Sequence, residues 1–253
     1  MDILLTMKTF EKYGIELPKI LLPKKDLDLK AWSVIACDQY TQDREYWNNV
    51  SDVAKDKPST LHIILPEIYL GDGDKALRIN NIQKNMVDYL SNNVFMPETS
   101  MMIYLERKTA YGRVRNLETY DWKPMSKALI RATEATIVDR IPPRMEIRRG
   151  APIETPHIML LVNDKDKCLV EACGEALKKS NKSCIYDTEL MAESGHITGW
   201  SIDSETELSM VQEALEKLYF QNTDANGEVF MFAVGDGNHS LATAKAVWDE
   251  LKE

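Results

Sequence analysis

The stretch FMFAVGDGNHSLATAKAVWDELK, from Phe230 to Lys252, decides the class of fold for this chain. Its first part belongs to the continuously apolar run Val229–Val234, which predicts a strand buried on both faces. Its second part, Ser240–Lys252, carries apolar residues at helical spacing and therefore predicts a helix. The turn Gly235–Ser240 lies between them and holds two glycines, an acid, an amide, an imidazole and a hydroxyl. Such a turn can present chemical groups to a ligand.

The alternation of strand and helix continues through most of the chain. Strand patterns cover residues 32–36, 61–65, 100–109, 112–122 and 157–164, and helix patterns cover 41–56, 75–93, 126–136, 166–180 and 203–224. Thr41 is the expected N-cap of its helix, and the proline- and arginine-rich residues 139–152 are expected to form a connector. We therefore expect an α/β or α+β protein, with a mixed sheet and flanking helices. Residues 1–125 and 126–253 are the two expected α/β regions, with one continuous domain as the alternative.

The composition excludes several classes of protein. The chain has 253 residues, of which 44% are apolar, and a net charge of −9. This acidity argues against nucleic-acid binding, which depends on lysine and arginine at phosphates. No apolar run is as long as the roughly 18 residues that a membrane span needs, and the four cysteines form no CxxC pair. We expect a cytoplasmic protein with free thiols and a small-molecule ligand, without nucleic acid or membrane as a partner.

The glycine-rich turn is a candidate anion site. The first turn of a helix leaves backbone N–H groups unpaired, and the helix dipole adds partial positive charge there. Gly235 and Gly237 would let the backbone approach a phosphate closely, and Asn238 or Ser240 could cap the helix. The alternative is a capped turn without a ligand, because short glycine motifs often occur by chance.

Three side chains are candidates for catalysis. Asp236 could hold a magnesium ion or accept a proton, and His239 could donate to a phosphate or act as a general base. Glu67 follows Pro66 at the end of the predicted strand Leu61–Leu65, where site residues often lie in α/β sheets. The alternative is structural for each of them: an incidental acid and histidine in the turn, and a plain turn acid at Glu67.

A cluster of arginines stands out in this acidic chain. Arginine binds phosphate and carboxylate groups well, because its guanidinium group forms two parallel hydrogen bonds. The alternative is surface ion pairing with Glu134, Asp139 and Glu146. The cluster consists of Arg131, Arg140, Arg144, Arg148 and Arg149.

The other histidines are spread singly and give no spacing typical of a metal site. His157 follows Pro156 at the start of a predicted strand. His196 lies in a glycine-flanked loop, where it is better placed to face a ligand. A nucleophilic pair of Cys37 with His239 stays open, because catalytic cysteine and histidine residues are adjacent in space rather than in sequence.

The turn also carries a family resemblance. FAVGDGNHSLATAKAVW resembles the Asp-Gly-(His/Asn)-His signature of the domain-of-unknown-function 1015 family. Four further stretches are similar to the same family: WSVIACDQYTQDREYW, STLHIILPEIYL, LIRATEATIVDRIPPRMEIRRGAPIETPHIMLLVND and YDTELMAESGHITGW. More distantly, the turn resembles the nucleotide-binding turn of the ParB/sulfiredoxin-like superfamily, which includes free-serine kinases that use ADP or ATP.

This wider resemblance implies a role for each residue of the turn. Residues Gly235–His239 would form a phosphate-binding turn. Many relatives have an arginine where this chain has Ser240, so Arg131, Arg144 or Arg148 would supply the positive charge. The implied cofactor is ATP or ADP with Mg²⁺, and the implied reaction is transfer of a phosphoryl group to a small hydroxyl metabolite.

Other functions follow less directly from the resemblance. A non-catalytic nucleotide or metabolite sensor is the alternative to a phosphotransferase, and turnover separates the two. Asn238 stands where sulfiredoxin has a cysteine, so thiol redox chemistry loses its nucleophile. The acidic charge counts against partition-type DNA binding. Family members also run past Glu253, so we expect a truncated chain whose missing part could hold partner strands, a homodimer interface or catalytic groups.

Overall fold

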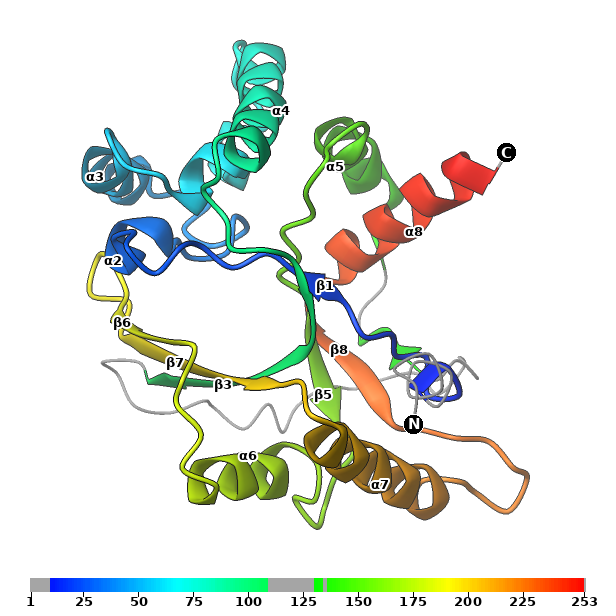
Figure 1. The fold of residues 1–253 in the computed structure, drawn as a ribbon. Coiled ribbons are helices and arrows are strands. Elements are labelled where there is room, and N and C mark those ends of the chain that lie inside the picture. The colour runs from blue at the N-terminus through cyan, green and yellow to red at the C-terminus, as the bar shows by residue number, and fades with distance from the viewer. Residues whose placement is uncertain (1–9, 109–129, 134–135, 253) are drawn as a thin grey trace.

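The computed structural model describes residues 10–108, 130–133 and 136–252. Within these ranges the chain forms three small β-sheets with helices around them, which is the mixed α/β architecture that the sequence predicts (Figure 1). The α-helices are α2 (Leu29–Trp32), α3 (Arg44–Ala54), α4 (Lys75–Ser91), α5 (Ile141–Arg148), α6 (Val170–Lys179), α7 (Glu205–Gln221) and α8 (Asn238–Lys252). The strands are β1 (Lys19–Ile20), β2 (Thr99–Ser100), β3 (Met102–Lys108), β4 (Ile130–Arg131), β5 (Met159–Val162), β6 (Tyr186–Glu189), β7 (His196–Ile202) and β8 (Phe232–Asp236).

Strand β8 is the middle strand of the sheet that positions the site. β4 pairs with β8 in parallel and β5 pairs with it antiparallel, so this sheet is mixed. Phe232 and Val234 of β8 are buried, and α8 begins directly after Gly237. The predicted succession of strand, glycine turn and helix is therefore confirmed, but its bounds differ, because β8 extends to Asp236 and α8 begins at Asn238, so that only Gly237 lies between them.

A second sheet connects early and late parts of the chain. It has the order β3-β7-β6 and is antiparallel throughout. β3 pairs with β7 over its full length, from Met102 opposite Ile202 to Lys108 opposite His196. Residues on either side of position 125 thus share one sheet. A small sheet of β1 and β2 lies beside it.

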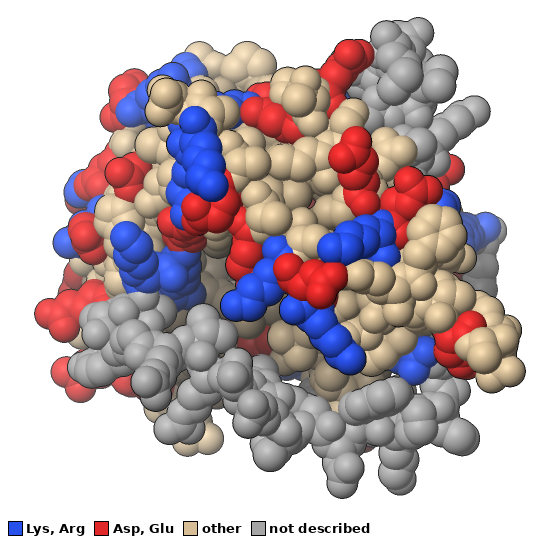
Figure 2. All heavy atoms as spheres, turned by 90° about the horizontal axis from the view of Figure 1, so that it is seen from below, with Lys and Arg blue, Asp and Glu red and all other residues tan. Residues whose placement is uncertain are grey.

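The largest apolar core lies between β8 and the helix pair α6 and α7, which lie on one side of the sheets in Figure 1. Leu215 and Leu218 of α7 are almost fully buried there. α7 begins with a capping box, in which the Ser204 hydroxyl accepts from the Glu207 N–H and the Glu207 carboxylate accepts from the Ser204 N–H. This pairing satisfies N–H groups that a helix start leaves open. On the face seen in Figure 2, basic and acidic side chains are interspersed rather than gathered by sign.

Two element predictions near Glu67 are wrong. Residues Thr60–Ile63 form a 3₁₀ turn, η1, instead of the strand 61–65, and Glu67–Tyr69 form a second one, η2. A short apolar run does not distinguish strand from helix, and here Ile63 and Leu65 bury their side chains in the α4 cluster. Glu67 therefore begins a 3₁₀ turn and does not end a strand. The stretch 33–36 likewise has no regular structure, and Asp43, not Thr41, caps α3.

The region of the arginine cluster also differs from expectation. The described part of the predicted helix 126–136 includes β4, whose two residues pair with β8. The expected connector 139–152 contains α5, because its prolines fall in the first helical turn, where the missing N–H has no helical partner to lose. The strand predicted at 112–122 lies outside the described residues.

Within residues 10–108, 130–133 and 136–252, none of the helices combines the length and the apolar character that a membrane crossing requires.

Candidate functional site

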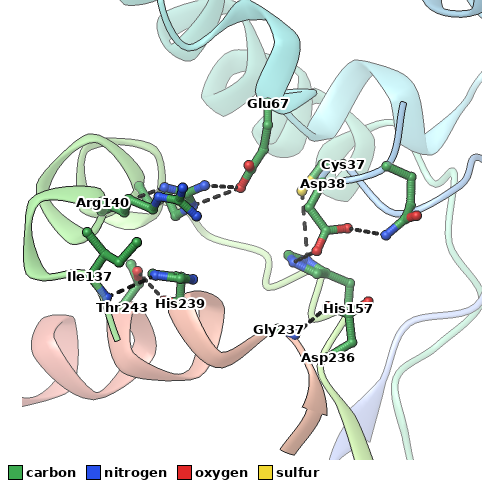
Figure 3. A network of polar contacts seen from close by, with 12 residues as sticks. Cys37, Asp38, Glu67, Ile137, Arg140, His157, Asp236, Gly237, His239 and Thr243 are labelled. Carbon is green, nitrogen blue, oxygen red and sulfur yellow. Dashed lines mark hydrogen bonds and ion pairs between the residues drawn. The ribbon is translucent and has the colours of Figure 1, made fainter. Parts of the chain in front are cut away.

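A pocket of about 550 Å³ lies at the start of α8. Its walls come from four parts of the chain that are far apart in sequence, namely residues 37–41, 63–86, 140–157 and 236–243. Figure 3 shows polar side chains from these segments around a common space. The volume falls in the range of pockets that hold small-molecule ligands.

The turn that opens α8 needs glycine for a structural reason. Gly237 has a φ of +84°, which only glycine adopts at little cost. A Cβ atom on Gly237 would lie 3.1 Å from the Cα of Ile158, so the turn also packs tightly against the chain that leads into β5. The Leu241 N–H donates to the Gly237 carbonyl, which places Gly237 at the N-cap position expected for Asn238 or Ser240. The sequence GDG therefore brings the helix start and residues 157–158 side by side.

Asn238 is the first residue of α8 and is 7% exposed. Its Nδ2 donates to Thr133 Oγ1 at 3.3 Å. Its Oδ1 is buried and has no hydrogen-bond partner among the described residues. A buried polar atom without a partner carries a free-energy cost, which an ordered water or a bound molecule would remove. Asn238 lines the pocket, which makes a ligand donor the fitting partner.

The other polar residues of the turn have defined contacts. The Ile137 N–H donates to His239 Nε2 at 3.1 Å, so this nitrogen serves as an acceptor. The Asp236 side chain is exposed at the end of β8, and its Oδ1 accepts from the Gly237 N–H. The Ser240 carbonyl accepts from an arginine of α5. The turn residues from Asp236 to Ser240 thus lie together at the pocket. Gly235 lies within β8, against Leu161, and does not line the pocket.

The predicted arginines divide into two groups. Arg144 lines the pocket and contacts Glu67, with Nε 2.8 Å from Oε1, and both side chains are largely buried. Arg148 also lines the pocket, forms a two-point ion pair with Glu154, and donates to the Ser240 carbonyl at 3.0 Å. Arg131 lies outside the pocket lining, with its guanidinium 4.4 Å from the centre of the Phe230 ring.

A thiol, an imidazole and a carboxylate meet on the opposite wall of the pocket. Cys37 Sγ lies 3.8 Å from His157 Nδ1, and Asp38 Oδ2 lies 3.4 Å from His157 Nε2 (Figure 3). The two neighbours Cys37 and Asp38 therefore contact both nitrogens of one ring. Gln39 Nε2 donates to Asp38, and the Glu67 N–H donates to the Cys37 carbonyl at 2.8 Å, which fixes this turn of the chain.

These contacts shift the protonation of the imidazole. The hydrogen bond to Asp38, and next the one to Cys37, raise the pKa of His157 from 6.5 to about 10 against the opposing effect of burial. Burial of Asp38 acts to raise its pKa, but the hydrogen bond and charge of His157 outweigh this and lower it. His157 is therefore an imidazolium at neutral pH, paired with the Asp38 carboxylate.

The sequence did not identify this group. The imidazole beside Cys37 is that of His157 and not that of His239. Cys37 and His157 are separated by 120 positions in the chain. The sequence offered little signal for this contact, because the apolar run before Cys37 and Asp38 forms no strand and His157 stands ahead of β5, which begins at Met159. His196 lies outside the pocket lining, between the carboxylates of Asp187 and Glu189.

In the described part of the chain, no cluster of three or more histidine, cysteine, aspartate or glutamate side chains is arranged to hold a metal ion. Asp236 could still contribute one carboxylate to a magnesium ion, because Mg²⁺ is commonly held by one or two carboxylates together with substrate phosphates.

Comparison with known proteins gives one match. The family described as "Protein of unknown function (DUF1015)" matches residues 21–253. Neither the curated proteins nor the solved structures contain a match to the chain.

Proposed function

The chain belongs to the DUF1015 family of proteins of unknown function, and we propose that its pocket binds a phosphorylated small molecule, in the first instance ATP or ADP with Mg²⁺. The observation that carries the proposal is the start of α8. A helix of 15 residues opens there into a pocket of about 550 Å³ through a glycine turn. The N–H groups of its first turn and its dipole favour an anion at this point.

The charges around the pocket favour a phosphate that arrives with its metal ion. Both signs are present among the described lining residues, with three arginines and four carboxylates: Arg140, Arg144, Arg148, Asp38, Glu67, Glu154 and Asp236. A bare polyphosphate would be repelled by the carboxylates, whereas its magnesium complex carries less negative charge. Asp236, exposed beside the helix start, is the residue that we assign to the magnesium ion.

We extend this proposal to phosphoryl transfer onto a small hydroxyl compound, as the resemblance to free-serine kinases implies. Transfer needs a base to receive the hydroxyl proton. Asp236 is the best placed of the three candidates in a complex where phosphate oxygens and water, and not Asp236, hold the magnesium ion. Its carboxylate is exposed at the pocket and accepts from the Gly237 N–H. Glu67 is engaged by Arg144, and His239 Nε2 accepts from Ile137.

The same contacts favour a second candidate, a nucleotide or metabolite sensor. Two of the three groups that could act as a base already have partners, which suits a site that binds without turnover. A sensor binds its ligand and leaves it unchanged, so assays of binding and of product formation separate the two candidates.

The experiment is calorimetric titration of the chain with ATP, ADP and CTP in the presence of magnesium. A matched pair of variants tests the location. Ser240→Asp adds a negative charge in the first turn of α8, where it suits the helix but opposes a phosphate. Ser204→Asp adds the same charge at the start of α7, away from the pocket.

We expect one nucleotide to bind, Ser240→Asp to weaken its binding at least about tenfold, or about 1.4 kcal/mol, and Ser204→Asp to leave it unchanged. Absence of binding by all three nucleotides would refute the proposal. An equal change of nucleotide affinity in the two variants would show that the nucleotide does not bind at the start of α8. Formation of ADP from ATP in the presence of serine would distinguish the phosphotransferase from the sensor.

A further inference from the structure

We propose that Cys37 is the nucleophile of a second chemistry in this pocket, the transfer of an acyl group from a small ester, thioester or amide through a thioester on Cys37. The proposal rests on the arrangement of Cys37, His157 and Asp38 and does not depend on nucleotide binding. The roles follow from the contacts. Cys37 contacts one ring nitrogen of His157, and Asp38 contacts the other and orients the ring.

The protonation of His157 suits this role. An imidazolium beside a thiol favours the thiolate, which is the reactive form of cysteine. The hydrogen bonds of the ring to Asp38 and then to Cys37 raise the pKa of His157 to about 10, so the ring carries its proton at neutral pH. Two other cysteines have no imidazole contact within the described part of the chain. Burial raises the pKa of Cys168, and raises that of Cys173 to about 11.

The pocket also offers hydrogen-bond donors for the oxyanion of an acyl transfer. His157 immediately precedes Ile158, which packs against Gly237 at the start of α8. Residues of that helix start line the same pocket as Cys37 and His157, so we assign their N–H groups as the donors that stabilise the developing negative charge. The buried Oδ1 of Asn238, which lacks a partner among the described residues, suits an N–H or O–H of the bound compound.

The steps balance without a further reagent except water. The Cys37 thiolate attacks the carbonyl carbon, a C–S bond forms, and the oxyanion lies against the α8 N–H groups. Collapse breaks the bond to the leaving oxygen, sulfur or nitrogen, which takes the proton of the His157 imidazolium. Water then attacks the thioester while His157 accepts one of its protons, and the acid leaves with the thiolate restored. A disulfide reaction is less suited, because Cys37 is the one cysteine among the described pocket residues.

The test compares cysteine reactivity in the full chain by mass spectrometry. Iodoacetamide reports the thiolate, and p-nitrophenyl acetate reports acyl transfer. Cys184 is exposed and serves as the internal reference thiol. The matched variants are His157→Gln and His196→Gln, because both histidines contact two acidic or thiol groups but only His157 contacts a cysteine.

We expect Cys37 at pH 7 to be alkylated at least about tenfold faster than Cys184, and to gain one acetyl group from p-nitrophenyl acetate. His157→Gln should lower both rates about tenfold, and His196→Gln should change neither. Asp38→Asn tests whether Asp38 positions the His157 ring, through the pH profile of Cys37 alkylation. Asp38 and His157 are in contact with each other and bear on this profile directly. The other ionisable groups among the described residues around the same pocket are Glu67, Glu154, Asp236, His239, Arg140, Arg144 and Arg148.

Two outcomes would overturn the proposal. Alkylation of Cys37 no faster than that of Cys184 would show that the thiol is not activated. Fast alkylation without any acetyl adduct would exclude acyl transfer. Alkylation and acetylation are both measured on the unmodified sequence, so these two outcomes can be read even if a variant fails to fold. Neither outcome affects the interpretation of the calorimetric titration with nucleotides.

Discussion

Replacing Asp38 with asparagine should lower the pKa of His157, because the carboxylate supplies the strongest of the contacts that hold the proton on the ring. The charged atoms are 3.4 Å apart. At an effective dielectric constant of about 20, such a pair interacts by about 5 kcal/mol. Both side chains retain some exposure, and Cys37 keeps its own contact with the ring. We therefore expect the midpoint of the His157 titration to fall by about 2 pH units, which is about 3 kcal/mol.

The assay is an NMR titration of the imidazole signals, with His157 assigned from the spectrum of His157→Gln. The chain has four histidines, so overlap is limited. Asp187→Asn is the matched control, since Asp187 contacts His196 in the same way that Asp38 contacts His157. An unchanged His157 titration in Asp38→Asn, or an equal fall in both variants, would refute the assignment of this contact.

The same contact makes stability depend on pH in a defined direction. The pKa of His157 is raised in the folded chain, so its contribution is complete below pH 6.5 and is lost as the pH rises through about 10. Over that window the free energy of unfolding from this group should fall by up to about 1.4 kcal/mol for each pH unit. Urea unfolding at several pH values should show this slope, and Asp38→Asn should flatten it.

Two further predictions concern stability. Gly237→Ala should cost about 2–4 kcal/mol, because it combines left-handed backbone strain with overpacking against Ile158. Gly227→Ala, with a φ of +80° and open space around it, should cost only about 1–2 kcal/mol, and equal losses in urea unfolding would contradict the close contact. Glu207→Gln should cost about 1 kcal/mol at pH 7, because it removes the ion pair with Lys182 but keeps an acceptor in the capping box. Burial acts to raise the pKa of Glu207, but Lys182 and the backbone N–H groups lower it from 4.5 to about 2. The contribution of Glu207 to the free energy of unfolding is therefore present above pH 4.5 and should disappear as the pH falls through about 2.

The parts of the fold that the sequence predicts are those with a local signal. β8 and α8 follow from a continuous apolar run and from helical spacing, and α7 follows from the helical pattern of residues 203–224. Residues 61–65 carry an equally apolar run but form a 3₁₀ turn, because their burial against α4 is a tertiary effect. Local patterns could not separate these two cases.

The site divides in the same way. The turn at 235–240 was predicted because all of its groups are neighbours in sequence, and the structure gives most of them a place at one pocket. The contact of Cys37 with His157 joins two segments that only the tertiary fold brings together. The arginines were found by their density in an acidic chain, but some of their glutamate partners, such as Glu250 at Arg149, depend on the packing of α5 against α8.

The long pairing of β3 with β7 affects the chain while it is still on the ribosome. Met102 and its partner Ile202 are 100 residues apart, so β3 emerges well before the strand that covers its edge. At about 5–20 residues per second the delay is about 5–20 seconds. An uncovered strand edge invites pairing with other chains, and charged residues discourage it. β3 ends in Glu106, Arg107 and Lys108, which gives the nascent chain this protection at one end of the strand and leaves the apolar end open to pairing until β7 is made.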